Sequence, residues 1–237
     1  MNGRVENRTY NGKERIGMDR SRYRLALASA SPRRQAFLKD LGFEFSATAT
    51  DVDESPMPGE KPIPLARRLA ESKAQAAARL LDVGERPLLI VAADTVVALG
   101  DELFGKPVDA ADASEMLARL RNRAHQVHSA VCVLALPEGK MSTLVNSTTV
   151  WMRDYSDAEI RDYVATGDPL DKAGAYAIQH PTFAPAESID GCLAGVMGLP
   201  LGDMCRLLAA YGVLPAVPVA DVCEGRTHFR CCQRNAG

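Results

Sequence analysis

The stretch LLIVAADTVVAL, residues 88–99, is an almost continuous apolar run. Such a run, without alternating polar residues, is typical of a strand that is buried on both faces of a sheet. Asp94 lies in its middle, where a carboxylate is costly unless it is hydrogen-bonded, paired or bound to a metal. The sequence therefore predicts a central strand that carries one charged group in need of a partner.

Strand-like and helix-like segments alternate on both sides of this run. Apolar spacing, caps and turn residues predict helices over residues 32–41, 65–81, 110–121, 156–167 and 201–211. Further strands are predicted over residues 23–29, 43–49, 126–136, 141–153, 175–179 and 184–189. Because hairpins interrupt the alternation, we expect an α/β fold with a mixed, twisted sheet and flanking helices.

The composition is that of an ordinary globular protein. Apolar residues make up 46% of the 237 residues, charged residues make up 24%, and the formal net charge is −2. This balance gives no electrostatic reason to expect a nucleic acid polymer or an anionic membrane as partner. No apolar run reaches the length of a membrane span, and the polar N-terminus lacks the hydrophobic segment of a secretory signal, so we expect a cytoplasmic protein.

The two ends of the chain differ from its middle. Residues 1–22 are polar and predict a disordered extension, residues 23–212 are expected to form one domain, and residues 213–237 are expected to be a C-terminal tail. Cys132, Cys192 and Cys205 lie in apolar or small-residue contexts and are interpreted as core residues. The tail contains Cys223, His228, Cys231 and Cys232, which could bind zinc, but their spacing is unusual for a zinc site and a disordered tail is favoured.

The segment ASASPRR, residues 28–34, predicts an anion site. A strand end, a tight turn and a helix N-terminus would present free backbone N–H groups, and Ser29 and Ser31 would add hydroxyl groups. Arg33 and Arg34 stand in the first helical turn, where the helix dipole disfavours cations unless an anion is bound. The alternative is a solvated helix start with the arginines spread over the surface.

Other polar residues are candidates for the same cleft. If Asp94 lies at the strand's C-terminal end, it would line a cleft together with Thr95; the alternative is an aspartate satisfied by backbone donors. Lys73 falls on the inward stripe of its helix, and Lys106 lies in a tight loop; either lysine could reach a phosphate or simply lie at the surface. The acidic pair of Asp53 and Glu54 could supply oxygen ligands for magnesium or manganese, although the local pattern favours the alternative of a plain polar loop.

Seven blocks of this sequence, taken in order, resemble the Maf family of nucleoside triphosphate pyrophosphatases. They are ASASPRR (28–34), DVDES (51–55), ESKAQA (71–76), AADTVV (92–97), FGKPVD (104–109), GDPLDKAGAYAIQ (167–179) and VMGLPL (196–201). The resemblance covers roughly residues 24–211. It implies an elongated, two-lobed fold with a central cleft, related to that of inosine triphosphate pyrophosphatases and often dimeric. It also implies hydrolysis of a nucleoside triphosphate to the monophosphate and pyrophosphate with Mg²⁺ or Mn²⁺.

The resemblance also implies roles for individual residues. Asp94 matches the proposed catalytic base and, with Asp53, the positions of a metal site. Positions associated with choosing the nucleobase correspond to Arg33, Thr95 and Gln179. Polar positions of the substrate pocket correspond to Ser29, Lys73 and Lys106, and Arg34 joins them through the predicted anion site.

The segment that ends at Gln179 resembles the branch of the family that prefers dTTP and UTP, although His180-Pro181 replaces the usual glycine after it. We therefore expect a house-cleaning enzyme for dTTP, UTP and modified pyrimidine triphosphates. A nucleotide-binding regulator of septation or division without turnover is one alternative, and a related enzyme for purine analogues is another.

Overall fold

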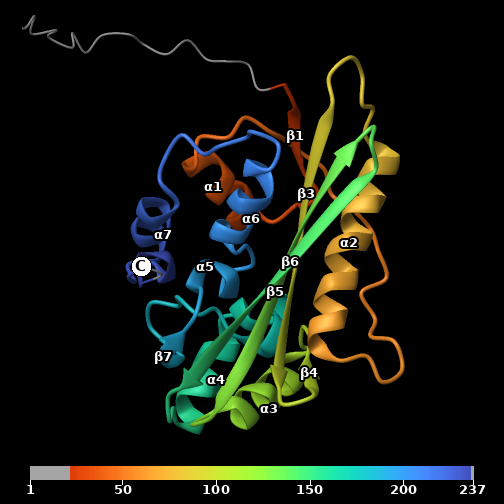
Figure 1. Cartoon of the computed structure of the whole chain (residues 1–237). Coiled ribbons are helices and arrows are strands. Elements are labelled where there is room, and N and C mark those ends of the chain that lie inside the picture. The colour runs from red at the N-terminus through yellow and green to blue at the C-terminus, as the bar shows by residue number, and fades with distance from the viewer. Residues whose placement is uncertain (1–21, 236–237) are drawn as a thin grey trace, which may run out of the picture.

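The computed structural model describes residues 22–235 (Figure 1), so the predicted extension at 1–22 lies outside them apart from Arg22. Within this range one seven-stranded mixed sheet has the order β2-β1-β3-β5-β6-β7, with β4 paired to β3. The strands are β1 (Arg24–Leu27), β2 (Ser46–Ala47), β3 (Leu88–Leu99), β4 (Glu102–Phe104), β5 (Ala124–Leu136), β6 (Lys140–Met152) and β7 (Ala186–Asp190). The pairs β2-β1 and β1-β3 are parallel and the others are antiparallel, which confirms the predicted mixed sheet.

Helices cover both faces and one end of this sheet, and the molecule is elongated (Figure 1). The long α2 (Pro62–Leu80) lies against one face, while α1 (Pro32–Asp40), α5 (Leu193–Val196), α6 (Leu201–Ala209) and α7 (Val219–Thr227) lie on the other side. The far end holds α3 (Ala110–Leu120) and α4 (Asp157–Ala165). The short helices are η1 (Asp168–Asp171), η2 (Ala173–Ala175) and η3 (Cys232–Asn235). None of the helices in the described range is long and apolar enough to cross a membrane.

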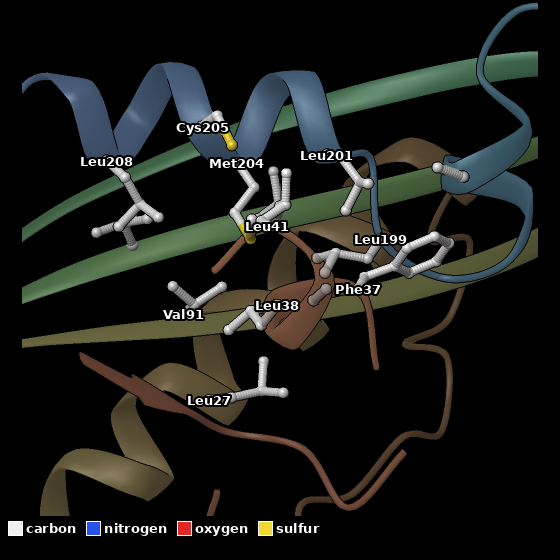
Figure 2. Packing of buried hydrophobic residues seen from close by; sticks show 14 of the residues in the cluster. Leu27, Phe37, Leu38, Leu41, Val91, Leu199, Leu201, Met204, Cys205 and Leu208 are labelled. Atoms are coloured by element: carbon white, nitrogen blue, oxygen red, sulfur yellow. The ribbon is translucent and has the colours of Figure 1, made fainter. Parts of the chain in front are cut away.

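The strand β3 is buried on both faces, as its composition predicts. Its alternating side chains point to opposite faces. Leu89 and Val91 pack in the cluster with α1 and α6, which Figure 2 shows, whereas Leu88 and Ile90 pack in the cluster with α2. A third cluster at the other end joins β3 to α3 and α4. One strand therefore runs through all three parts of the core.

The helix α1 follows β1 through the turn that the sequence predicts. Ser31 is the N-cap, its hydroxyl accepts from the N–H of Arg34, and Pro32 opens the helix. At the other end of α1, Gly42 follows the C-cap Leu41 with φ of +79°, and a Cβ atom there would lie 2.7 Å from Cβ of Ala216. The predicted helix start is thus confirmed, and it faces the cleft described below.

Two segments differ from their predictions. The predicted strand at 175–179 is wrong, because Gly174 and Ala175 both have positive φ values of 71° and 60° and turn the chain instead. This turn buries the Tyr176 side chain, whose hydroxyl lies 2.7 Å from Nε2 of His125. Only Ser46–Ala47 of the predicted strand at 43–49 is a strand.

The C-terminal segment is folded, in contrast to the disordered tail favoured by its composition. Residues 219–227 form α7, and Val222 and Cys223 are buried in the same core cluster as α1 and α6. Among residues 22–235 no group of three or more His, Cys, Asp or Glu side chains could hold a metal ion, and His228 is exposed at the end of α7. The predicted zinc alternative therefore has no support in the structure.

Candidate active site

A cleft of about 800 Å³ opens between α1, α2, β3, the loop after β4 and the segment after η2. Seven residues predicted from the sequence line it: Arg33, Arg34, Lys73, Asp94, Thr95, Lys106 and Gln179. The predicted cationic side chains come from three separate segments and line the same cleft as Asp94. This convergence is the arrangement that a polyphosphate site requires.

The ammonium group of Lys73 joins two carboxylates at the centre of the cleft. Its Nζ lies 2.5 Å from Oδ1 of Asp94 and 2.6 Å from Oε1 of Glu54. The side chains of Lys73 and Asp94 are 12% and 9% exposed, whereas that of Glu54 is 50% exposed. Asp94 therefore has the charged partner that a carboxylate in a buried strand needs. Glu54 contacts the same ammonium group from the more exposed side.

The electrostatic environment shifts the pKa values of the two carboxyl groups in opposite directions. Burial raises the pKa of Asp94 above its usual range, although the Lys73 ammonium and the Arg34 guanidinium act in the opposite direction. Burial acts to raise the pKa of Glu54 as well, but the hydrogen bond from Lys73 and the nearby positive charges outweigh it. The pKa of Glu54 therefore lies below its usual range. A carboxylate with a raised pKa is the better proton acceptor, and this points to Asp94.

Arg34 is held in place by two acceptors. Its Nε donates to the carbonyl of Gly198 at 2.8 Å, and its Nη1 donates to the Ser29 hydroxyl at 3.4 Å. Gly198 has φ of +109°, and a Cβ atom there would lie 3.3 Å from Arg34 Nε. Ser29 is buried and is not part of the cleft lining, so its contact with the cleft runs through Arg34.

Arg33 and Lys106 are the more exposed cations of the cleft, and both residues line it. Arg33 follows Pro32 in the first turn of α1, close to the N-terminal end of the helix dipole. The predicted combination of a helix N-terminus with clustered cations is therefore present on one wall.

Thr95 lies next to Asp94 on β3 and joins a short chain of hydroxyl groups. Its Oγ1 lies 2.8 Å from Oγ of Ser129, which in turn donates to the Gly195 carbonyl at 2.7 Å. Because the Ser129 proton is used in that way, Thr95 donates to Ser129 and keeps lone pairs that can accept a hydrogen bond from a ligand.

Gln179 lines the cleft and contacts the C-terminal segment. Its Nε2 donates to the carbonyl oxygens of Arg226 and Thr227 at 3.1 and 3.3 Å. Both partners are acceptors, so the amide nitrogen must face them and the amide oxygen is directed elsewhere. The sequence does not predict that the tail supports this residue.

Asp53, like Ser29, is a predicted site residue that does not line the cleft. It is exposed and accepts a hydrogen bond from the N–H of Ser55 at 2.9 Å, whereas its neighbour Glu54 lines the cleft. The loop is tied to α2 because Arg68 donates to the Ser55 carbonyl at 2.9 Å and pairs with Glu60 at 2.7 Å. The acidic pair of Asp53 and Glu54 indicates in the sequence that this loop contributes a carboxylate to the cleft. Only the folded turn decides that Glu54 is the one that enters it.

Lys172 and Asp171 also line the cleft and are not predicted from the sequence. The buried ammonium group of Lys172 lies 2.6 Å from Oδ1 of Asp171 and 2.9 Å from Oδ1 of Asp168. Because both carboxylates and the Asp168 carbonyl bind this ammonium, Lys172 stabilises the turn before Tyr176. In the sequence, only the position of Lys172 within the block that ends at Gln179 indicates that this residue belongs to the site.

The residues present fit a divalent cation that is shared with a substrate. Asp94 and Glu54 supply carboxylate oxygens around Lys73, and magnesium is commonly bound by one or two carboxylates together with substrate phosphates. Since the described residues contain no group of three such side chains, they do not form an all-protein metal cage.

A family profile described as Maf-like protein matches residues 24–211, which is most of the chain. The chain belongs to the Maf family. This member is 44% identical over 192 residues to the dTTP/UTP pyrophosphatase of Chromobacterium violaceum, which covers 80% of the chain and 95% of the relative. It is 45% identical over 189 residues to the dTTP/UTP pyrophosphatase of Nitratidesulfovibrio vulgaris, covering 79% and 88%.

The dTTP/UTP pyrophosphatase of Pasteurella multocida is 42% identical to this Maf protein over 196 residues. The alignment covers 81% of this Maf protein and 97% of the relative. Solved structures match more weakly. The Staphylococcus aureus Ham1 protein aligns with a TM-score of 0.38 and 16% identity, covering 55% of this chain and 72% of its own. The matched region ends before α7, so the segment that contacts Gln179 lies beyond it.

Proposed function

We propose that this Maf protein is a nucleoside triphosphate pyrophosphatase that prefers dTTP and UTP. The observation that carries the proposal is the buried pair of Asp94 and Lys73 in a cleft that also holds Arg33, Arg34 and Lys106. The similarity to relatives named dTTP/UTP pyrophosphatase supports the choice of substrate.

The cations of the cleft bind the triphosphate. A nucleoside triphosphate carries close to four negative charges, and Arg33, Arg34 and Lys106 offset them together with the N-terminal end of α1. Arg34 is oriented by Gly198 and Ser29, so its guanidinium needs little ordering when the substrate binds. Positioning and charge stabilisation account for most of the rate in phosphoryl chemistry.

Asp94 accepts the proton of the attacking water. The water oxygen forms a bond to phosphorus, the α–β phosphoanhydride bond breaks, and the products are the nucleoside monophosphate and pyrophosphate. The raised pKa of Asp94 suits this role because the carboxylate then takes up a proton more readily. Lys73 keeps the carboxylate in place and holds its charge until the water is bound.

A divalent cation would be held by Asp94 and Glu54 with the phosphate oxygens of the substrate. When bound, it supplies Lewis-acid stabilisation of the charge that develops on the phosphates. The predicted ligand Asp53 is replaced by Glu54 in this proposal, because the Glu54 side chain lies in the cleft.

Gln179 and Thr95 select the base. The amide oxygen of Gln179 and the hydroxyl of Thr95 can accept hydrogen bonds, and the N3–H group that uracil and thymine share is a donor. The amide nitrogen of Gln179 is fixed by the C-terminal segment, so the acceptor side of this residue is the one presented to a ligand.

A nucleotide panel tests the proposal. The protein is incubated with dTTP, UTP, dCTP, ATP and GTP in Mg²⁺ or Mn²⁺, and the release of pyrophosphate is measured. We expect the highest kcat/KM for dTTP and UTP. Binding without pyrophosphate release would instead support the regulator of division, and preferential turnover of a purine triphosphate would contradict the pyrimidine preference.

A further inference from the structure

Four of the six cysteines lie around one small cavity, away from the cleft. Cys192, Cys223, Cys231 and Cys232 line a space of about 220 Å³ between the start of α5 and the C-terminal segment. All the cysteines of the described range are free thiols. Cys192 is buried and Cys232 is partly exposed, so a buried thiol and a solvent-accessible thiol face the same space.

The C-terminal segment that carries Cys232 is firmly docked. Arg234 pairs with Glu224 at 2.8 Å and with Asp221 at 2.7 Å, which ties η3 to α7. The side chain of Gln233 lies against Gly202 of α6, where a Cβ atom would come within 1.8 Å of its amide nitrogen. These contacts hold Cys232 beside the helices that surround Cys192.

The thiols differ in their readiness to react. Hydrogen bonding by the Cys192 thiol, with further hydrogen bonds from Cys231 and from the N–H of Gln233, lowers the pKa of Cys232 to about 6. The same hydrogen bond and burial raise the pKa of the Cys192 thiol. Because the thiolate is the nucleophile, Cys232 is the thiol that attacks an oxidant first at neutral pH.

The two thiols belong to segments that each support a residue of the cleft. The segment that begins at Cys192 includes Gly198, whose carbonyl accepts from Arg34. The segment that leads to Cys232 includes Arg226, whose carbonyl accepts from Gln179. A bond between the two sulfur atoms would therefore connect the segment that holds Arg34 to the segment that holds Gln179.

We propose that Cys192 and Cys232 form a reversible disulfide that ties the C-terminal segment to the wall of the cleft. The oxidant is a peroxide. The Cys232 thiolate attacks a peroxide oxygen, the O–O bond breaks, and a sulfenic acid forms. The Cys192 sulfur then attacks the Cys232 sulfur, the S–S bond forms, and hydroxide leaves. The two thiol protons complete two molecules of water, so two thiols are oxidised and one hydrogen peroxide is reduced.

The geometry favours Cys192 over the other neighbours as the second thiol. Consecutive Cα atoms are about 3.8 Å apart, below the usual range of about 4.4–6.8 Å for a disulfide, which disfavours a bond between Cys231 and Cys232. Cys223 lies on α7, within the C-terminal segment itself, so of the remaining two thiols only Cys192 would join this segment to α5. Cys192 and Cys232 line the same cavity from two different segments of the chain.

Peptide mapping of the full-length protein tests this proposal without any nucleotide. The protein is treated with hydrogen peroxide, remaining thiols are alkylated, and the digest is analysed by mass spectrometry. We expect a cross-linked peptide pair containing Cys192 and Cys232, which dithiothreitol separates. The cross-link should raise Tm by about 5 °C over the reduced protein, because it closes a long loop.

Two variants make the result specific. In Cys232→Ser the cross-link and the rise in Tm should both be absent, whereas Cys132→Ser, a buried cysteine of β5 outside the cavity, should keep both. A Cys223–Cys231 cross-link, sulfinic acid at Cys232 without a cross-link, or an unchanged Tm after cross-linking would each overturn the proposal. A failure of the nucleotide assay would leave these readouts unchanged, so the two proposals fail separately.

Discussion

The Nζ atom of Lys73 and the Oδ1 atom of Asp94 lie 2.5 Å apart, although one residue belongs to a helix and the other to the central strand. The pair is nearly excluded from water, and the Coulomb attraction between its members offsets part of the cost of burying both charges. A substrate or a metal that binds Asp94 must therefore share it with Lys73. The first two predictions concern this pair.

Asp94→Asn should lower kcat/KM for the preferred nucleotide by about 10²–10⁴-fold, because an amide cannot accept the proton of the attacking water. The fold should persist, since asparagine has the same shape and Lys73 keeps its contact with Glu54. Pyrophosphate release and Tm measure the two effects. Asp101→Asn, at an exposed position, is the matched control and should retain activity. Full activity of Asp94→Asn would exclude the residue as the base.

Lys73→Gln should move the acidic limb of the pH–rate profile to higher pH. The Lys73 ammonium opposes the rise in the pKa of Asp94 that burial causes, so its removal raises that pKa further. Asp94 is then protonated, and unable to act as a base, up to a higher pH. The profile of kcat/KM against pH measures the shift, and Lys61→Gln, an exposed lysine, should leave it in place. A downward shift would contradict the assignment.

Gln179→Ala should reduce the preference for UTP over GTP by about tenfold, since one hydrogen bond to the base is lost. The loss should appear mainly in KM, because Gln179 is assigned to the nucleobase and not to the reacting phosphate. Steady-state kinetics with both nucleotides measure it. Gln126→Ala, on β5 and bonded to Thr149, is the matched control. An unchanged ratio would remove Gln179 from the base site.

Glu60→Gln should remove a pH-dependent part of the stability. Hydrogen bonding by Arg68 lowers the pKa of Glu60 from 4.5 to about 2. A folded-state pKa below the unfolded value stabilises the protein above about pH 4.5, and this contribution disappears as pH falls toward 2. The difference in Tm between the native protein and the variant should therefore narrow as pH is lowered from 6 to 3. A constant difference would contradict it.

Leu38→Ala should lower the free energy of unfolding by about 3 kcal/mol, because its side chain is fully buried between α1 and the sheet. Urea titration measures the loss. Leu214→Ala, at a position that is 68% exposed, should change it by less than about 0.5 kcal/mol. Equal effects of the two variants would place Leu38 outside the core.

Local signals predicted the elements that frame the site. The run at residues 88–99 is a buried strand, and Ser31 and Pro32 begin a helix as expected. Asn122 follows the C-cap of α3 and has the left-handed conformation expected of a residue that ends a helix, with φ of 55°. These features depend on backbone preferences and on apolar periodicity, which a short window of sequence contains.

Other features depend on contacts between distant segments. The turn at Gly174 and Ala175 replaces an expected strand, because burying Tyr176 against His125 outweighs the strand preference of the short apolar segment. Glu54, and not Asp53, enters the cleft because of how Arg68 holds the loop. Neither outcome is visible in the local pattern of residues.

The family, the central strand and the charged residues that a polyphosphate site needs can all be recognised in the order of residue types along the chain. Only the tertiary structure decided which of those residues meet. It formed the ion pair between Lys73 and Asp94, and it brought the carbonyl groups of α7 within hydrogen-bond distance of Gln179. Such contacts arise when distant segments pack to bury their apolar faces, and the position of each polar group then follows from the packing of the whole chain.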